Sequence, residues 1–198
     1  MRAPAEEPGL SLWAMGRQFD DEVLEGDGFR LSPLNSGDVE DVTSACRDET
    51  TQRWLPLPAP YTADAARAFI EDIAPEMHTS GAGLVRRIEI AGRLCGVIDL
   101  KKTDWLVRQT EIGYWVAPWA RGRGLAGKAS RVLADWALSD QSMARVVIHC
   151  ATGNKASQKA AVSAGFIHEG VARSGGLVHS GRVDLAVFSK ISSDLDLA

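Results

Sequence analysis

The sequence has few of the residues that mark membrane or secreted proteins. No run of about 18 apolar residues occurs along the chain, and this excludes a transmembrane helix. The three cysteines, Cys46, Cys95 and Cys150, are far apart and odd in number, which is unlike a disulfide framework. Glu6 and Glu7, close to the start, do not suit a secretory signal. We therefore predict a protein of the reducing cytoplasm.

Paired metal ligands and an excess of basic charge are also missing. The four histidines are dispersed, and no two of them have the spacing of metal ligands, so no metal site is expected. The net charge is −4, whereas a nucleic-acid binder usually carries a basic face. Apolar residues make up 45% of the 198 positions, enough for one sizeable core. We predict one main globular domain without nucleic-acid, membrane or metal partners.

The two ends of the chain lack the periodic patterns of the rest. We assign residues 1–26 to an N-terminal extension, residues 27–193 to the domain and residues 194–198 to a C-terminal tail. Apolar residues at positions 10–15 of the extension form either a short anchor or part of a loosely ordered tail.

Hydrophobic patterns divide the domain into strands and helices. Strands are predicted at residues 29–34, 84–90, 94–100, 110–116, 146–148, 166–171 and 183–191. Helices are predicted at residues 38–47, 63–77, 125–138 and 154–164, and three prolines at positions 56–60 predict a loop. This order favours a mixed α/β (α+β) class, with a central mixed sheet of about seven strands flanked by helices.

A glycine-rich turn between a predicted strand and an amphipathic helix is the most informative segment. It has the sequence VAPWARGRGLAG at residues 116–127. A turn in this setting directs several backbone N–H groups at one point, and the positive end of the helix dipole adds to them. Gly122 and Gly124 let the backbone approach a ligand closely, while Arg121 and Arg123 add positive charge. The natural ligand is a pyrophosphate.

Two phosphate-binding motifs fit this turn. Residues 122–127 formally match the dinucleotide fingerprint GxGxxG, which is weak evidence by itself. That fingerprint should follow the first strand of a parallel sheet and precede an acidic residue at the end of the next strand. Here it follows the fourth predicted strand, and the next strand ends in His149 and Cys150. The context argues against a dinucleotide site.

The second motif is Arg-x-x-Gly-x-Ala, at Arg121, Gly124 and Ala126, and it resembles the coenzyme A pyrophosphate loop of the GNAT acetyltransferases. The segment EIGYWV at residues 111–116 resembles the fourth strand of the RimJ/RimL branch, which modifies protein N-termini. This resemblance implies the GNAT fold, with a splayed gap between the fourth and fifth strands that receives the pantetheine arm.

The resemblance continues towards the C-terminus and covers about residues 28–191 in element order. Asn154 and Ser157, followed by AGF at residues 164–166, resemble the Asn-x-x-Ser…Gly-Phe segment of the same branch. It implies acetyl-CoA as cosubstrate. The expected cofactor-binding residues are Trp115, Val116, Arg121, Gly122, Arg123, Gly124, Leu125, Ala126, Gly127 and Asn154.

The roles of these residues also follow from the resemblance. Main-chain amides of residues 122–127 would hold the pyrophosphate, and a backbone N–H near Val116 would donate to the oxyanion. Asn154 can equally be an ordinary helix N-cap, and Trp115 and Val116 can also serve core packing. No metal is implied, because a thioester is already activated.

The implied reaction is direct attack of an amine on the thioester in a ternary complex. Glu111 is the expected general base, directly or through water, although it can equally be a solvated carboxylate; Asp99 is the reserve candidate. Ser157 is expected to hydrogen-bond the departing thiolate. An α-amine with a pKa near 8 is roughly 10% neutral at pH 7, so it needs little help from a base. An acyl-Cys150 route is disfavoured, because His149 should point to the other face of its strand.

The acceptor is less well defined than the cofactor. Trp54 and Tyr61 flank the proline-rich loop, which borders the acceptor pocket in RimJ/RimL relatives, so we expect them to bind substrate; local packing is the alternative. A protein N-terminus, a small amine and an aminoglycoside-like antibiotic all stay open as acceptors, as does a homodimer. A phosphate loop also does not separate an enzyme from a catalytically silent acyl-CoA sensor.

Overall fold

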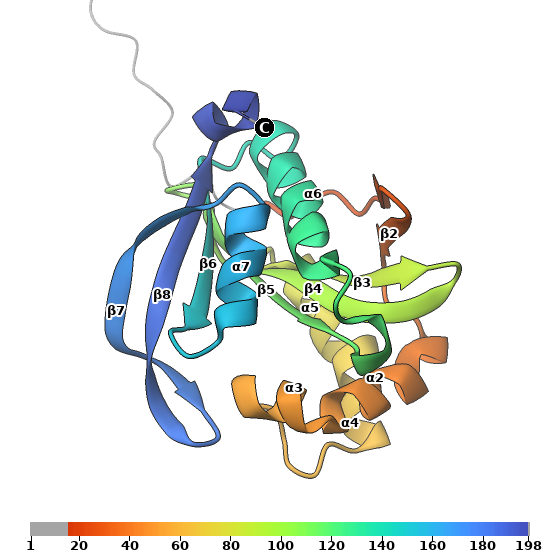
Figure 1. The fold of residues 1–198 in the computed structure, drawn as a ribbon. Helices are drawn as coiled ribbons and strands as arrows, with labels where there is room; N and C mark the ends of the chain where they lie inside the picture. The colour runs from red at the N-terminus through yellow and green to blue at the C-terminus, as the bar shows by residue number, and fades with distance from the viewer. Residues whose placement is uncertain (1–15, 198) are drawn as a thin grey trace, which may run out of the picture.

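The computed structural model describes residues 16–197 (Figure 1). Its strands are β1 (Leu24–Gly26), β2 (Phe29–Ser32), β3 (Leu84–Ile90), β4 (Arg93–Asp104), β5 (Gln109–Val116), β6 (Arg145–Ala151), β7 (Ile167–Val178) and β8 (Gly181–Ile191). Its α-helices are α2 (Val39–Arg47), α3 (Glu49–Trp54), α4 (Ala63–Ala68), α5 (Ala74–Thr79), α6 (Leu125–Ser139) and α7 (Lys155–Ser163). Shorter helical segments are η1 (Ser36–Asp38), η2 (Phe69–Ile73), η3 (Pro118–Ala120) and η4 (Ser192–Leu197).

One mixed sheet organises the fold. Its strand order is β1-β2-β3-β4-β5-β6-β8-β7, and every neighbouring pair is antiparallel except the parallel pair β5 and β6. The predicted class and the central mixed sheet are confirmed. The sheet has eight strands instead of about seven, because the short strand β1 extends one edge.

Helices cover both faces of this sheet (Figure 1). The larger core lies between the sheet and the layer of α6 and α7, and it includes Ile112 with Tyr114 packed against it. A second core lies on the side of α2 and α4 and includes Val42, with Trp115 packed against it. Successive side chains of a strand point to opposite faces. Glu111 therefore shares its face of the sheet with Trp115.

The domain begins before residue 27. Phe19 is 1% exposed, and its ring centroid lies 4.8 Å from that of Trp105 and 6.1 Å from that of Trp136. Within the segment that we assigned to the extension, Phe19 and Leu24 thus belong to the larger core, and Leu24–Gly26 form β1. A single phenylalanine and a strand of three residues have no readable periodicity. The apolar residues at positions 10–15 lie outside the described residues.

Two further boundaries differ from the prediction. The segment assigned to a C-terminal tail overlaps η4, and Leu195 packs against the larger core. Before the proline-rich loop the chain forms the helix α3, which was not predicted, and Trp54 is its last residue.

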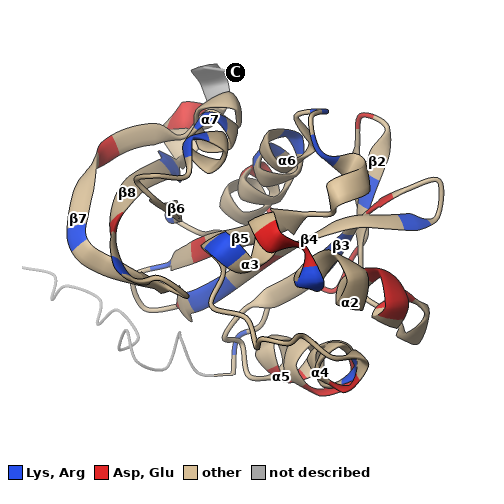
Figure 2. Ribbon diagram, turned by 60° about the horizontal axis from the view of Figure 1, so that its bottom comes forward, with Lys and Arg blue, Asp and Glu red and all other residues tan. Residues whose placement is uncertain are grey.

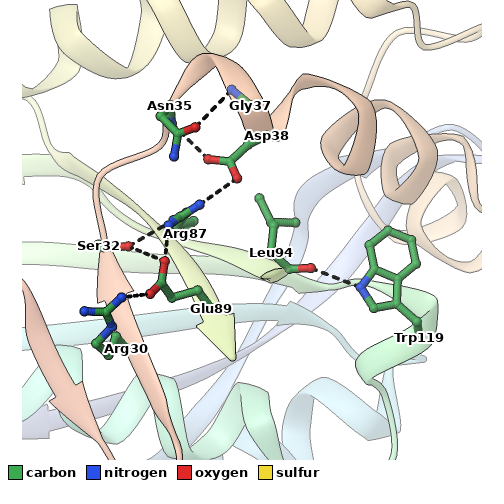
Figure 3. Close-up of polar contacts among 9 residues, drawn as sticks. All are labelled: Arg30, Ser32, Asn35, Gly37, Asp38, Arg87, Glu89, Leu94 and Trp119. Atoms are coloured by element: carbon green, nitrogen blue, oxygen red, sulfur yellow. Dashed lines mark hydrogen bonds and ion pairs between the residues drawn. The ribbon is translucent and has the colours of Figure 1, made fainter. Parts of the chain in front are cut away.

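A buried network of charges joins β2, β3 and η1 (Figure 3). Glu89 lies between the guanidinium groups of Arg30 and Arg87 and accepts a hydrogen bond from Ser32 Oγ at 3.2 Å. Arg87 also donates to Asp38 Oδ1 at 2.9 Å. Burial alone would raise the pKa of Glu89, but the two arginines lower it. Two carboxylates thus face two guanidinium groups, as buried charges require.

Charged segments of both signs are distributed over the sheet and both helical layers (Figure 2). In the described part of the chain, no helix is long and apolar enough to cross a membrane.

Candidate active site

Strands β5 and β6 separate halfway along β5. Their parallel pairing ends with Ile112 opposite Ile148. Beyond this point, β5 stays paired with β4 as far as Val116, whereas β6 pairs with β8 as far as Ala151. Residues 113–116 of β5 and residues 149–151 of β6 are therefore not paired with each other, and we call the gap between them the splay. The family resemblance predicts such a gap between the fourth and fifth strands of the GNAT fold.

Backbone N–H groups of β5 point alternately towards β4 and into the splay. The N–H of Ala117 donates to the carbonyl of Cys95, next to β4, at 2.8 Å. The register between β4 and β5 is regular along this part of the strand, and N–H groups two residues apart point the same way. The N–H groups of Tyr114 and Val116 therefore point into the splay.

The phosphate loop, residues 121–127, lies where β5 passes through η3 into α6. Gly122 (φ +78°) and Gly124 (φ +68°) have left-handed backbone conformations, and a Cβ at either position would meet no heavy atom within 4 Å. Gly124 is the N-cap of the 15-residue helix α6, and no side chain caps the first amides. These free amides and the helix dipole form a suitable site for a pyrophosphate.

The side chain of Arg121 turns away from the phosphate loop. Its Nη2 donates to Asp48 Oδ2 at 2.5 Å and to Thr51 Oγ1 at 2.8 Å, and its Nε donates to Val116 O at 3.1 Å. Asp48 is the N-cap of α3 and accepts from Thr51 N at 3.0 Å. The guanidinium is thus bound to α3 and β5, and the predicted contact of Arg121 with the cofactor stays a prediction.

Other side chains of the loop pack instead of facing a ligand. Leu125 is 5% exposed within the larger core. A Cβ on Gly127 would come within 2.1 Å of Ser163 Oγ, so this glycine allows α7 to approach α6. Both residues can contact a cofactor only through the main chain, which is how the amides were predicted to act. The cofactor contacts of Arg123 and Ala126 stay predictions.

Trp119 anchors the phosphate loop to the sheet (Figure 3). Its Nε1 donates to Leu94 O at 3.0 Å, and the guanidinium of Arg93 lies 4.7 Å from the centroid of its ring. Because Trp119 precedes the loop by two residues, this contact fixes the point from which the loop leaves β5.

Ser157 lies beside the splay and is held by Tyr114. Its Oγ is 2.9 Å from the Tyr114 hydroxyl, which also donates to Ser157 O at 3.1 Å. Burial raises the pKa of Tyr114 to about 12 against the lowering effect of Ser157, so the phenol keeps its proton at neutral pH. Asn154 caps α7 by accepting from Ser157 N at 3.1 Å. The N-cap alternative for Asn154 is thus observed, and its cofactor contact stays a prediction.

Glu111 is surrounded by cationic and hydrogen-donating groups. Its side chain is 12% exposed, and Oε2 lies 2.9 Å from Lys102 Nζ and 3.0 Å from His149 Nδ1. Oε1 lies 3.8 Å from Lys101 Nζ. The bulge after Lys101, where Lys102 has φ +51°, lets two successive lysines reach one carboxylate. Burial would raise the pKa of Glu111, but His149 and the lysines lower it to about 2.

Asp99 lies closer to the splay on the same face of the sheet. It is opposite Gly113 in the β4–β5 pair, and its buried Oδ1 has no hydrogen-bond partner among the described residues. Lys101 Nζ lies 3.8 Å away. Burial is the main cause that raises the pKa of Asp99, and the charge of Glu111 adds to it against Lys101. The two neighbouring carboxyl groups thus have opposite pKa shifts.

Trp54 and Tyr61 lie in different environments. The ring of Trp54 lies against the loop between β6 and α7, since a Cβ on Gly153 would be 3.3 Å from Trp54 Cη2. Tyr61 is 5% exposed and belongs to the second core, where it contacts Cys46. The packing alternative is thus observed for Tyr61, and the substrate roles of Tyr61 and Trp54 stay predictions.

Three residues of this site were not assigned a role from sequence. Tyr114 was included only in the strand segment EIGYWV, Asp48 belongs to no recognised motif, and His149 was considered only as a base for Cys150. The structure confirms that Cys150 and His149 lie on opposite faces, because Cys150 is buried in the larger core while His149 contacts Glu111. Within residues 16–197, no group of three or more His, Cys, Asp or Glu side chains is placed to hold a metal ion.

Comparisons with known proteins agree with this geometry. Residues 29–167 match the family described as acetyltransferase (GNAT) domain. The chain is 34% identical over 138 residues to the Bacillus subtilis (strain 168) protein named "Putative ribosomal N-acetyltransferase YdaF", which covers 68% of this chain and 74% of that protein. It is 27% identical over 115 residues to the ribosomal-protein-serine acetyltransferase of Escherichia coli (strain K12), covering 58% and 64% of the two chains.

A solved structure has the same fold. RimL, a ribosomal L7/L12 α-N-protein acetyltransferase in complex with coenzyme A, matches with a TM-score of 0.78 at 19% identity. The match covers 86% of this chain and 98% of RimL.

Proposed function

The chain belongs to the acetyltransferase (GNAT) family, and on this premise we propose that it acetylates the N-terminal α-amine of a protein. Dependence on acetyl-CoA and transfer to an amine follow from the family. The observation that carries the assignment is the phosphate loop, which follows directly from the β5 segment that lines the splay. The names of YdaF and of the Escherichia coli relative, both referring to ribosomal proteins, support a protein acceptor.

The residues present fit acetyl-CoA. The free amides at the start of α6, with the open space at Gly122 and Gly124, would hold the pyrophosphate. The N–H groups of Tyr114 and Val116 face the splay, where an extended chain that carries amides can pair as an added strand does. Bound acetyl-CoA supplies an acyl group that is already activated as a thioester.

The side chains around the splay divide the chemistry between its two faces. On the face towards α7, the Ser157 hydroxyl, held by the protonated Tyr114, can donate a hydrogen bond to a departing thiolate. The N–H of Val116 is the proposed donor to the oxyanion. The opposite face carries Glu111, with its neighbour His149, and Asp99. These are the groups that can receive the proton of the amine. Trp54, whose ring lies against the loop between β6 and α7, is the proposed contact of the acceptor.

The acceptor class is testable with matched peptides. The full chain, acetyl-CoA and a peptide with a free N-terminal serine should release thiol, and mass spectrometry should place one acetyl group on the α-amine. The control is the same peptide with a blocked N-terminus and an internal lysine. A polyamine and an aminoglycoside complete the panel.

The outcomes separate the alternatives. Acetylation of the polyamine or the aminoglycoside alone would overturn the protein acceptor and leave the family assignment standing. Binding of coenzyme A without thiol release on any amine would favour the catalytically silent sensor.

A further inference from the structure

His149 is the first residue of β6 beyond its pairing with β5. The last paired residues are Ile112 and Ile148, so His149 lies at the closed end of the splay, next to Gly113 along the direction of the strands. Its ring is on the face that carries Glu111. The phosphate loop follows the other end of β5, so an acyl chain that runs along β5 from that loop extends towards His149.

Glu111 fixes the proton arrangement of the imidazole. Its carboxylate accepts a hydrogen bond from His149 Nδ1 at 3.0 Å, and an ionised carboxylate can only accept. Nδ1 therefore carries a proton, and in the neutral ring Nε2 is the basic nitrogen. No residue within 16–197 hydrogen-bonds Nε2, and the side chain of His149 is 31% exposed. The same arrangement orients the histidine in serine hydrolases.

We infer that His149 is the general base of the acetyl transfer and that Glu111 is its positioning residue. This inference rests on the proposed function. The amine nitrogen forms a bond with the thioester carbonyl carbon, and Nε2 takes the proton that the nitrogen then loses. The bond between carbon and sulfur breaks, its electron pair leaves with the thiolate, and the imidazolium returns its proton to solvent.

The neighbouring groups favour His149 over Glu111 as the direct base. Lys101, Lys102 and His149 all surround Glu111, which leaves this carboxylate a weak proton acceptor. The same carboxylate accepts from Nδ1 of His149 and so leaves Nε2 as the proton-accepting nitrogen. Asp99 is the competing candidate, because its Oδ1 has no hydrogen-bond partner within the described chain.

The charges around His149 come from several strands. Glu111 faces it from β5. Lys101 and Lys102 of β4 approach the carboxylate of Glu111, and Asp99 lies beside Lys101. From the β7 side, Glu169 interacts electrostatically with His149. Glu169 is itself paired with Arg145 of β6 at 2.5 Å. The imidazole therefore has both carboxylates and cationic side chains around it.

The first test compares His149→Gln with wild type from pH 5.5 to pH 9.5 on the peptide with a free N-terminal serine. The ratio of the two kcat/KM values cancels the titration of the amine itself. Because Nε2 accepts the amine proton only when it carries no proton itself, the ratio should rise with pH, to about 100-fold or more. His168→Gln, an exposed histidine on β7, is the matched control and should show no such rise.

A second test uses chemical rescue. Free imidazole should restore part of the activity of His149→Ala and none of that of Asp99→Asn, an effect that a purely structural role would not give. Glu111→Gln should also lower kcat, because the ring loses its positioning residue. The stabilisation of each variant by coenzyme A shows that its fold and cofactor site are intact.

The inference would be overturned if the ratio of the wild-type and His149→Gln kcat/KM values did not change with pH and if imidazole gave no rescue. Activity of the wild type would in that case still support the proposed function. Loss of the pH dependence in Asp99→Asn instead would assign the base to Asp99. Absence of transfer by the wild type would reject the proposed function itself.

Discussion

Arg121 Nη2 donates to Asp48 Oδ2 at 2.5 Å and thereby joins the phosphate loop to the N-cap of α3. The helix that ends at Trp54 is thus tied to the loop expected to hold coenzyme A. The two sides of the proposed site are connected through one ion pair, which is only partly shielded from solvent.

Arg121→Ala should therefore affect the acceptor more than the cofactor. We expect a higher KM for the peptide, a small change in coenzyme A affinity, and a loss of about 1 kcal/mol in the free energy of unfolding, because partly exposed ion pairs are weak. Urea denaturation of Arg121→Ala, Asp48→Asn and the double variant measures the coupling. Strictly additive losses would show that the pair does not connect the two elements.

Gly124→Val should weaken coenzyme A binding strongly. A branched side chain would fill the open space at the loop and would strain a backbone with φ +68°. Gly92→Val, in the turn between β3 and β4, is the control for strain alone, since Gly92 has φ +81° and open space around it. Calorimetric titration with coenzyme A should show a loss for the first variant only; equal affinities would argue against a phosphate cradle.

Ser157→Ala should lower turnover more than coenzyme A affinity, and the defect should persist from pH 6 to pH 9.5. The reason is that departure of the thiolate is not relieved by deprotonating the amine. Tyr114→Phe should give part of the same defect, because its hydroxyl holds Ser157 Oγ at 2.9 Å. Measured kcat for the two single variants and the double variant tests this. Wild-type turnover in Ser157→Ala would remove Ser157 from the mechanism.

The lowered pKa of Glu111 predicts a pH-dependent contribution to stability. Its folded value of about 2 lies below the ordinary 4.5, so the folded state binds this proton less readily than the unfolded state. The contribution is present above about pH 5 and is lost as pH falls towards 2, with a magnitude on the order of 3 kcal/mol. Urea denaturation of wild type and Glu111→Gln at pH 7, 5 and 3 should give a shrinking difference.

The exposed carboxylate of Glu71 supplies the control for that measurement. Glu71→Gln should differ little from wild type at each of the three pH values. A difference for Glu111→Gln that stays constant from pH 7 to pH 3 would contradict the assigned ion pairs.

The phosphate loop and the elements around it could be predicted from the sequence, because their signals are local. The end of a strand, two glycines and the start of an amphipathic helix lie within the single stretch 116–127. Gly122 and Gly124 do adopt the left-handed conformations that such a turn requires. The mixed sheet followed from the order of apolar patterns in the same way.

The partners of the site residues were decided only by the tertiary structure. Ser157 and Tyr114 are 43 positions apart, Arg121 and Asp48 are 73 apart, and His149 and Glu111 are 38 apart. The sequence determined which strand and which face each side chain occupies, through the alternation of residues along β5 and β6. The contacts between these side chains depend on the pairing of β5 with β6, which are parallel and separate after Ile112. Such pairing joins residues that are far apart in the sequence, so the local pattern of residues does not reveal it.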